Sequence, residues 1–403
     1  MKCRFCSHNL IHPLIDLVNA PPSNSYLTLE QLSEPEIFYP LKVLVCEKCF
    51  LVQVDEYQKS NKIFDANYAY FSSMASSWVA HAKSYVEMIV TKQQLTSNSH
   101  VIEIASNDGY LLQFFKSKEI PCLGIEPTKS TADVARSKGI DVIEDFFGEK
   151  LAKTLHKADL ILGNNVLAHV PDINDFVKGL KVALKANGVI TMEFPHLLNL
   201  IEKSQFDTIY HEHFSYLSLK TTQLIFQTHG LQIYDVEELP THGGSLRIYA
   251  THRENNVLKS LHVNTVLEKE TFAYLDTLKG YMGFQTKANR IKHDFLNFLL
   301  QEKAHHKKVV GYGAAAKGNT LLNYCGIKND LIDFVVDKSP LKVGKYLPSS
   351  HIPIVQEHQI KTLKPDFVVI FPWNIKEEIQ EQLRYIEEWG GKFVIAVPAL
   401  EIL

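Results

Sequence analysis

The chain has 403 residues, of which 45% are hydrophobic and 22% are charged. This length exceeds one ordinary hydrophobic core, so we expect two or three globular domains. The formal net charge is -3 and no long block of Lys or Arg occurs, which argues against a nucleic-acid-binding protein. No apolar signal region or membrane-length apolar run is present, so we predict a cytoplasmic protein that does not associate with membranes.

Residues 1–62 contain short strand-like pieces interrupted by prolines. A segment this short and interrupted cannot form a stable hydrophobic core without a disulfide or a structural metal. Two CxxC pairs lie in it, formed by Cys3, Cys6, Cys46 and Cys49. Two such turns can present four thiolates to zinc at about 2.3 Å, which suits the spacing better than a redox pair or free thiols. We therefore predict a structural zinc module.

Residues 63–245 alternate apolar strand-like segments with amphipathic helical segments. The strand-like segments are residues 101–105, 122–126, 141–145, 159–165 and 188–194. This alternation predicts an α/β fold with a doubly wound parallel sheet.

Residues 246–403 begin with a helical connector, roughly residues 257–305. A second alternation follows, with strand-like segments at residues 308–313, 331–337, 365–371 and 392–397. It predicts a second, smaller α/β domain of the Rossmann-like type.

The turn after the first strand of the central sheet suits a ligand that carries no phosphate. It has a single glycine, so it is a poor phosphate cradle, whereas an adenosyl group is easier to accommodate. Glu126 closes the next strand, where it can accept hydrogen bonds from ribose hydroxyls, although it could also be a surface carboxylate. Phe147 is as compatible with core packing as with adenine stacking. The candidates for binding a cofactor with an adenosyl group are Glu103, Ala105, Ser106, Asn107, Asp108, Gly109, Glu126, Pro127, Asp145, Phe146, Phe147, Asn164 and Asn165.

Histidine, glutamate and tyrosine side chains are dense after the fifth strand, in the run YHEHF of residues 210–214. Such groups near the carboxyl edge of a sheet can supply a proton acceptor and groups that orient it. A metal site is an alternative, but Glu212 would point away from its histidine neighbours on an extended segment. Purely structural polar residues are another alternative. Upstream, Tyr68 and Tyr70 either form a lid over the site or pack.

A GxGxxA fingerprint follows the first strand of the C-terminal domain, and an acidic residue, Asp337, ends the next strand. This is the spacing of a dinucleotide site, so an NAD-dependent oxidoreductase is one candidate function. Lys317 offers a cation at the helix N-terminus for a diphosphate. A non-enzymatic zinc-ribbon binding protein is a second candidate, disfavoured by the acidic balance.

Taken together, these motifs resemble the deoxysugar C-methyltransferases, which include 3-C-methyltransferases acting on nucleotide-linked 4-keto sugars. The resemblance spans essentially the whole chain. It is carried by the paired CxxC and by YAYFSS, EIASNDGYLL, LGIEP, NNVLAHVPD, FDTIYHEHFSYLS, HGGSLR, VVGYGAAAKGNTLLNYCGI and FPWN. It implies a zinc-binding N-terminal domain, a class I S-adenosylmethionine methyltransferase domain, and a C-terminal Rossmann-like domain that holds the nucleotide of the sugar.

The resemblance also implies residue roles. The last histidine of the motif that matches YHEH is the expected base, here His213, and the other catalytic candidates are Glu212, Tyr210, Tyr70, Tyr68 and His169. The candidates for substrate binding are Gly311, Gly313, Ala314, Lys317 and Asp337. Ala105 replaces a glycine that is usual in the family, which we expect to tighten the donor turn. His211 is at a position that varies in the family, which argues against an essential role.

The implied reaction is methylation of a carbon, carbon 3, of a dTDP- or GDP-linked 4-keto-deoxysugar after base-catalysed enolisation. The zinc takes no part in it. N- or O-methylation of the same substrate class remains an alternative, and we expect a monomer or a weak homo-oligomer.

Overall fold

The computed structural model describes residues 1–59 and 71–403. The chain forms two compact units. The first consists of Met1–Ile11, Val45–Leu198 and Phe214–Gly280, and the second of His12–Leu44, Asn199–His213 and Tyr281–Leu403. Each unit combines parts of more than one predicted module, so the division at residues 62 and 245 stays a prediction. Within the described ranges, no helix has both the length and the apolar character needed to cross a membrane.

The first unit is built on a seven-stranded sheet in the order β6-β5-β4-β7-β8-β11-β10. Strands β4 to β8 pair in parallel, whereas β11 runs antiparallel to both of its neighbours. The strands are β4 (Val101–Ile104), β5 (Cys122–Ile125), β6 (Asp141–Ile143), β7 (Ala158–Asn164), β8 (Leu184–Pro195), β10 (Leu231–Leu239) and β11 (Ser245–His252). This order, with one reversed strand beside the edge, confirms the class I methyltransferase fold predicted for the centre of the chain.

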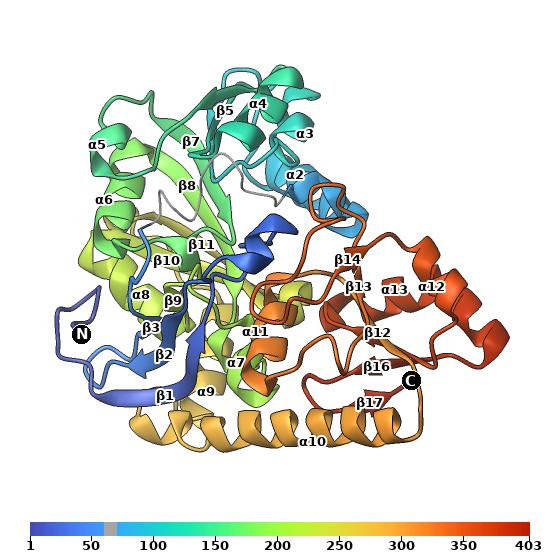
Figure 1. Ribbon diagram of the computed structural model, residues 1–403. Helices are drawn as coiled ribbons and strands as arrows, with labels where there is room; N and C mark the ends of the chain where they lie inside the picture. The colour runs from blue at the N-terminus through green and yellow to red at the C-terminus, as the bar shows by residue number, and fades with distance from the viewer. Residues whose placement is uncertain (60–70) are drawn as a thin grey trace. The chain divides into compact units, whose positions relative to one another are not determined.

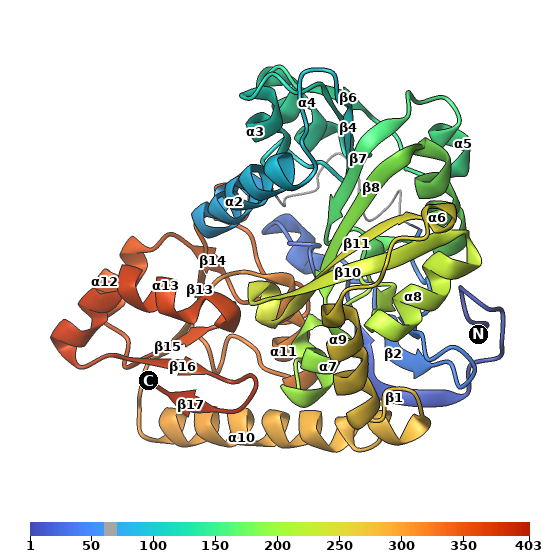
Figure 2. The same cartoon turned by 180° about the vertical axis from the view of Figure 1, so that it is seen from behind.

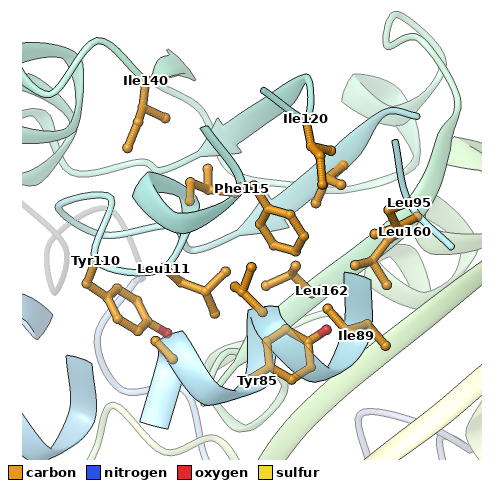
Figure 3. Packing of buried hydrophobic residues seen from close by; sticks show 14 of the residues in the cluster. Tyr85, Ile89, Leu95, Tyr110, Leu111, Phe115, Ile120, Ile140, Leu160 and Leu162 are labelled. Carbon is orange, nitrogen blue, oxygen red and sulfur yellow. The ribbon is translucent and has the colours of Figure 1, made fainter. Parts of the chain in front are cut away.

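Helices cover both faces of this sheet, as Figure 2 shows. One face carries α2 (Ser76–Lys92), α3 (Leu112–Lys116) and α4 (Lys129–Ser137), and the other carries α5 (Glu149–Ala152), α6 (Ile173–Ala183) and α8 (Leu219–Thr228). The core under α2 is apolar: Tyr85 and Ile89 of this helix pack with Phe115 of α3 and with Leu160 and Leu162 of β7 (Figure 3). Burial of these side chains fixes the helices on the sheet, at about 1.5 to 3 kcal/mol for each large one.

Smaller elements complete the first unit. Strand β3 (Val52–Val54) pairs with β9 (Ser215–Tyr216), and α9 (Leu261–Phe272) follows β11. Glu270 of α9 is fully buried, and its carboxylate accepts hydrogen bonds from the backbone N–H groups of Leu219 and Lys220 at the start of α8. The same carboxylate lies 2.7 Å from Nε2 of His196. One side chain therefore caps α8 and ties α9 to the end of β8.

The second unit contains a six-stranded sheet in the order β14-β13-β12-β15-β16-β17, parallel except for β17. Its strands are β12 (Val309–Tyr312), β13 (Val335–Val336), β14 (Ile354–Val355), β15 (Phe367–Ile370), β16 (Lys392–Ile395) and β17 (Glu401–Ile402). Helix α10 (Phe284–Ala304) lies along one face, where Phe298 meets Phe367 of β15 edge to face at 5.2 Å (Figure 1). Helices α12 (His358–Leu363) and α13 (Lys376–Gln382) cover the other face. The predicted Rossmann-like C-terminal fold is confirmed.

The remaining helices and strands lie outside these two sheets. Helix α11 (Ala316–Cys325) follows β12, and β1 (His12–Ala20) and most of β2 (Tyr39–Val45) belong to the second unit. The short helix α7 (Leu197–Glu202) follows β8. The helical connector expected over roughly residues 257–305 contains two helices: α9 ends at Phe272, and α10 begins at Phe284, directly after Gly283 with its left-handed φ of 79°.

Candidate active site

The four cysteines of the two CxxC pairs converge. Their Sγ atoms all lie within 4.8 Å of one another, and Cys3–Cys49 and Cys6–Cys46 are separated by 3.5 Å each. Four sulfurs at 2.3 Å from a tetrahedral zinc are about 3.8 Å apart, so the cluster fits the metal. Four thiolates leave no open coordination position, which makes the site structural. In residues 1–59 and 71–403 no other group of three or more His, Cys, Asp or Glu is close enough to hold a metal, so the YHEH histidines form no such group.

The first CxxC turn is fastened to α6 and to the segment before it, through Arg4 and its neighbour Phe5. The Arg4 guanidinium donates a hydrogen bond of 2.9 Å to the carbonyl of Pro171 and lies 5.2 Å from the ring centre of Phe214. The amide of Asn174 in α6 donates to the carbonyls of Arg4 and Phe5, at 3.1 and 3.0 Å. The contacted segment directly follows the 3-10 turn Leu167–His169. The zinc module therefore supports the loop that carries one predicted site residue, His169.

The donor turn at the carboxyl end of β4 has three residues in the left-handed region. The φ angles are 58° for Ala105, 49° for Asn107 and 73° for Gly109. Because β5 and β7 lie on opposite sides of β4, this turn is at the point where the strand order reverses, the usual ligand position in such sheets. The Cβ atom of Ala105 makes its conformation costly, by about 1 to 2 kcal/mol, where a glycine would have little strain.

Buried polar atoms without a partner in the described chain gather around this turn. They are both carboxylate oxygens of Glu103, Oγ of Ser106, Oδ1 of Asp108 and Oγ1 of Thr128. Burial raises the pKa of Glu103 well above its usual range, and the neighbouring Asp108 and Glu126 raise it further. Orphaned buried acceptors of this kind suit a polar ligand with a cationic group, which is what S-adenosylmethionine offers at its sulfonium and ammonium.

Glu126 is only 4% exposed, so it is not a surface carboxylate. Its Oε2 accepts from the backbone N–H of Asn107 and its Oε1 from that of Thr128, both at 2.9 Å. Burial raises the pKa of Glu126. The side chain thus joins the donor turn to the loop after β5, which also contains half-buried Pro127. A second contact, from the N–H of Ser72 to Oδ1 of Asn107 at 2.8 Å, fastens the end of the YAYFSS run to the same turn.

The predicted adenine-binding group after β6 divides in two. Phe147 packs edge to face on Phe176 of α6 with ring centres 5.4 Å apart, which is the core arrangement considered from the sequence. Phe146 is 43% exposed, and Asp145 is exposed with Oδ1 accepting from the N–H of Phe146. Asp145 and Phe146 are therefore exposed, whereas Phe147 is half-buried against α6.

Asn164 and Asn165 lie at the end of β7, as expected, and each has a partner. The Asn164 amide donates to the hydroxyl of Tyr110 at 3.2 Å, and the Asn165 amide lies 2.9 Å from Nε2 of His242. His242 has a left-handed φ of 53°. Its ring meets Trp78 of α2 edge on, with centres 5.0 Å apart.

Sequence reasoning missed a polar network at the end of β8. The buried carboxylate of Glu193 accepts from Arg247 at 2.7 Å and from Thr241 at 2.8 Å, and it lies 2.9 Å from Nε2 of His81. His81 in turn stacks on Trp78 with centres 5.0 Å apart. The available signal was the run HGGSLR, which contributed to the family resemblance without a role assigned to its residues.

The YHEH segment is part of the second unit. Nδ1 of His213 lies 2.8 Å from the carbonyl oxygen of Thr208, and the rings of Tyr210 and His213 are 4.0 Å apart. Burial raises the pKa of Glu212 to about 7, although the amide of Asn24 donates to its Oε1 at 2.7 Å. The structure thus brings Tyr210, Glu212 and His213 together on one segment.

His211 has a different environment from His213. Its Nε2 lies 3.1 Å from the carbonyl oxygen of Pro40, its ring meets Tyr39 edge on at 5.9 Å, and burial lowers its pKa. These contacts are those of a structural histidine. His169 is half-buried in the first unit, and Tyr68 and Tyr70 lie outside the described residues.

The GxGxxA turn of the second unit is closely packed. A Cβ atom on Gly311 would lie 2.5 Å from Phe371, and one on Gly313 would lie 2.5 Å from Pro372. The carboxylate of Asp337 accepts from the N–H groups of Ala314 and Ser339, both at 2.8 Å. The carboxylate of Asp337 thus fixes the GxGxxA turn through backbone N–H groups, as the carboxylate of Glu126 fixes the donor turn.

Lysine and tyrosine side chains lie at and just after the same turn. Nζ of Lys342 and the hydroxyl of Tyr26 donate to the carbonyl of Ala314, at 2.8 and 2.6 Å. Lys317 is half-buried, and its Nζ donates to Oδ1 of Asn374 at 2.6 Å and lies 4.7 Å from the ring centre of Trp373.

Family models match almost the whole chain. Residues 3–64 match the "Putative zinc binding domain", residues 80–236 the "Methyltransferase domain" and residues 240–398 the "C-methyltransferase C-terminal domain". Solved structures that resemble parts of the chain include magnesium protoporphyrin IX methyltransferase of Synechocystis PCC 6803 (14% identity, 43% of this chain and 79% of that chain, TM-score 0.35). Another is an S-adenosylmethionine-dependent methyltransferase of Clostridium acetobutylicum (10% identity, 44% and 91%, TM-score 0.35). Scores this low carry no argument.

A relative in full length is C-methyltransferase NovU of Streptomyces niveus, 31% identical over 406 residues that cover 100% of this chain and 96% of the relative. Identity at this level along the entire chain establishes the family, in agreement with the motifs, the sheet order and the cysteine cluster. The chain belongs to the C-methyltransferase family and is an S-adenosylmethionine-dependent C-methyltransferase with a structural zinc site.

Proposed function

We propose that this chain methylates carbon 3 of a dTDP- or GDP-linked 4-keto-deoxysugar, with His213 as the base. The proposal depends most on the 2.8 Å contact between Nδ1 of His213 and the carbonyl of Thr208. A carbonyl only accepts, so Nδ1 carries the proton and the lone pair of the neutral ring lies on Nε2. A carbon acid must lose a proton to a positioned base before its carbon can attack. The Nε2 lone pair of His213 can accept that proton.

In the proposed reaction the ketone at carbon 4 acidifies the C–H bond at carbon 3. Nε2 of His213 takes that proton, and the electrons of the C–H bond form an enolate with the carbonyl oxygen. The enolate carbon then bonds to the methyl carbon as the methyl–sulfur bond breaks, with its electron pair left on sulfur. Bound S-adenosylmethionine supplies the electrophilic methyl group. The proton on Nδ1 stays in the hydrogen bond to Thr208, which stabilises the imidazolium as it forms.

Other residues of the chain bind and orient in this proposal. The buried acceptors of the donor turn, led by Glu103, bind the methyl donor, and Glu126 shapes that turn and contacts the ribose. Tyr210 and Glu212 set the surroundings of His213, and His169, Tyr68 and Tyr70 are further candidates for substrate contacts. The C-terminal range 246–403 holds the nucleotide near the GxGxxA turn and Lys317.

The base assignment is tested with His213→Asn. We expect kcat to fall by roughly 10² or more, the scale of a lost general base, with S-adenosylmethionine affinity nearly unchanged. Exchange of the α-proton of the sugar with deuterated water, measured without methyl donor, should stop as well. His211→Asn is the matched control, because His211 is hydrogen bonded to Pro40 and should retain both activities. Wild-type exchange and methylation by His213→Asn would disprove the assignment.

The substrate class is tested by thermal shift, since a ligand stabilises the protein as its concentration exceeds its dissociation constant. Shifts with S-adenosylhomocysteine and with dTDP or GDP, but none with NAD, support the proposal. A shift with NAD alone would support the oxidoreductase alternative. NMR of the product then decides between methylation at carbon 3 and methylation at oxygen or nitrogen.

A further inference from the structure

The segment that carries His213 is fastened to the C-terminal part of the second unit by two side-chain hydrogen bonds. The indole N–H of Trp373 donates to Oδ2 of Asp207 at 2.7 Å. The hydroxyl of Thr320 in α11 donates to the backbone carbonyl of Ile209 at 2.9 Å. The two acceptors flank Thr208, whose carbonyl holds Nδ1 of His213. The chain is therefore fixed on both sides of the group that orients the imidazole.

Water has little access to these two bonds. Asp207 is 1% exposed, Thr320 is 2% exposed and Ile209 is fully buried. Burial raises the pKa of Asp207 to about 6, so it accepts as a carboxylate above that pH. A buried acceptor that loses its donor is left unsatisfied, and the free-energy cost of this favours rearrangement of the local chain.

Apolar packing fixes the position of the segment before His213 but not the direction of its peptide groups. Phe206 meets Tyr324 of α11 edge to face, with ring centres 5.6 Å apart. Such packing defines where the turn Phe206–Thr208 lies, but a ring contact tolerates rotation of the following peptide groups. The directional contacts come from Thr320, on the peptide carbonyl of Ile209, and from Trp373, on the side-chain carboxylate of Asp207.

We propose that Trp373 and Thr320 are positioning residues for His213, which hold the Thr208 carbonyl so that His213 keeps its proton on Nδ1 and its lone pair on Nε2. The inference rests on the proposed function of His213 as the base. It gives the C-terminal Rossmann-like part a second task besides holding a nucleotide, namely ordering the proton acceptor of the reaction.

The test uses Trp373→Phe, which removes the indole N–H and keeps an aromatic ring, and Thr320→Val, which removes the hydroxyl at similar volume. The tautomer of His213 is read by NMR of protein labelled with ¹⁵N-histidine, and its signals are assigned by their absence in His213→Asn. Trp389→Phe is the matched control, because the indole N–H of Trp389 donates at 2.9 Å to the carbonyl of Pro365 instead.

In the wild type and in Trp389→Phe we expect one tautomer, with the proton on Nδ1, and full activity. Trp373→Phe and Thr320→Val should each show a mixture of tautomers and lower kcat by about tenfold, the scale of one lost hydrogen bond. Affinity for S-adenosylmethionine should stay unchanged in every variant, which also shows that the variants fold.

Failure of this inference and failure of the proposed function give different results. If Trp373→Phe and Thr320→Val keep the wild-type tautomer and kcat while His213→Asn is inactive, His213 remains the base and the positioning roles are wrong. If His213→Asn is fully active, the proposed base is wrong, and the inference falls with it.

Discussion

Replacement of Glu212 by Gln tests how strongly the second unit disfavours a buried negative charge. Glu212 is 5% exposed, and burial raises the pKa of its carboxyl from 4.5 to about 7. Gln has the same shape and can still accept the hydrogen bond from Asn24. The variant therefore removes the titration and little else.

The sign follows from which state loses its proton first. As the pH rises above 4.5 the unfolded chain ionises, whereas the folded chain retains the proton until about pH 7, so rising pH favours unfolding. Above pH 7 both states are ionised and the cost is complete. At 1.36 kcal/mol for each pH interval of one, a difference between about 7 and 4.5 corresponds to about 3 kcal/mol at pH 8 and to less than about 1 kcal/mol at pH 5.

The assay is urea unfolding at pH 5 and pH 8, followed by tryptophan fluorescence. Glu212→Gln should be more stable than the wild type by up to about 3 kcal/mol at pH 8, with a much smaller gain at pH 5. Glu202→Gln, on an exposed glutamate, is the control and should change stability at neither pH. A gain that is equal at the two pH values, or a loss at pH 8, would refute the reasoning.

Three further perturbations test the fold. Ala105→Gly should stabilise the protein by about 0.5 to 1 kcal/mol in urea unfolding, because relief of the left-handed strain exceeds the added freedom of glycine; a loss would argue against the conformation at residue 105. Metal analysis should find one zinc per chain, and Cys46→Ser should lower both zinc content and Tm; full zinc retention would contradict the four-cysteine site. Glu270→Ala should cost about 3 to 5 kcal/mol in urea unfolding, since His196 and the start of α8 lose a buried acceptor; a cost under about 1 kcal/mol would show that these groups find other partners.

Continuous apolar runs made most of the two sheets predictable. The central strands are short and buried on both faces, so they appear in the sequence as segments such as VIEI and FVVI. Strands β10 and β11 were not predicted, because a bulge between Ile233 and Asp235 interrupts the alternation of apolar residues in β10. The cysteine spacing predicted the zinc site because the chemistry needs only four thiolates that can meet.

The site was predictable by residue type and less so by partner. The sequence placed Glu126 after a strand, but its bonds to two backbone N–H groups depend on the folded turns. The network of Glu193 and Arg247 joins residues far apart in the chain, which local patterns do not reveal. The tautomer of His213 depends on the direction of the Thr208 carbonyl, a property of the folded segment alone.

The composition of the second unit has a consequence for biosynthesis. Its first part, residues 12–44, forms backbone hydrogen bonds with its last part, as between Leu27 and Tyr346. At a synthesis rate of about 5 to 20 residues per second, Leu27 leaves the ribosome roughly 15 to 60 s before Tyr346 does. During that time the nascent N-terminal strands lack their partners. We expect this enzyme to depend on chaperones during translation, and fragments that end before residue 281 to aggregate when expressed alone.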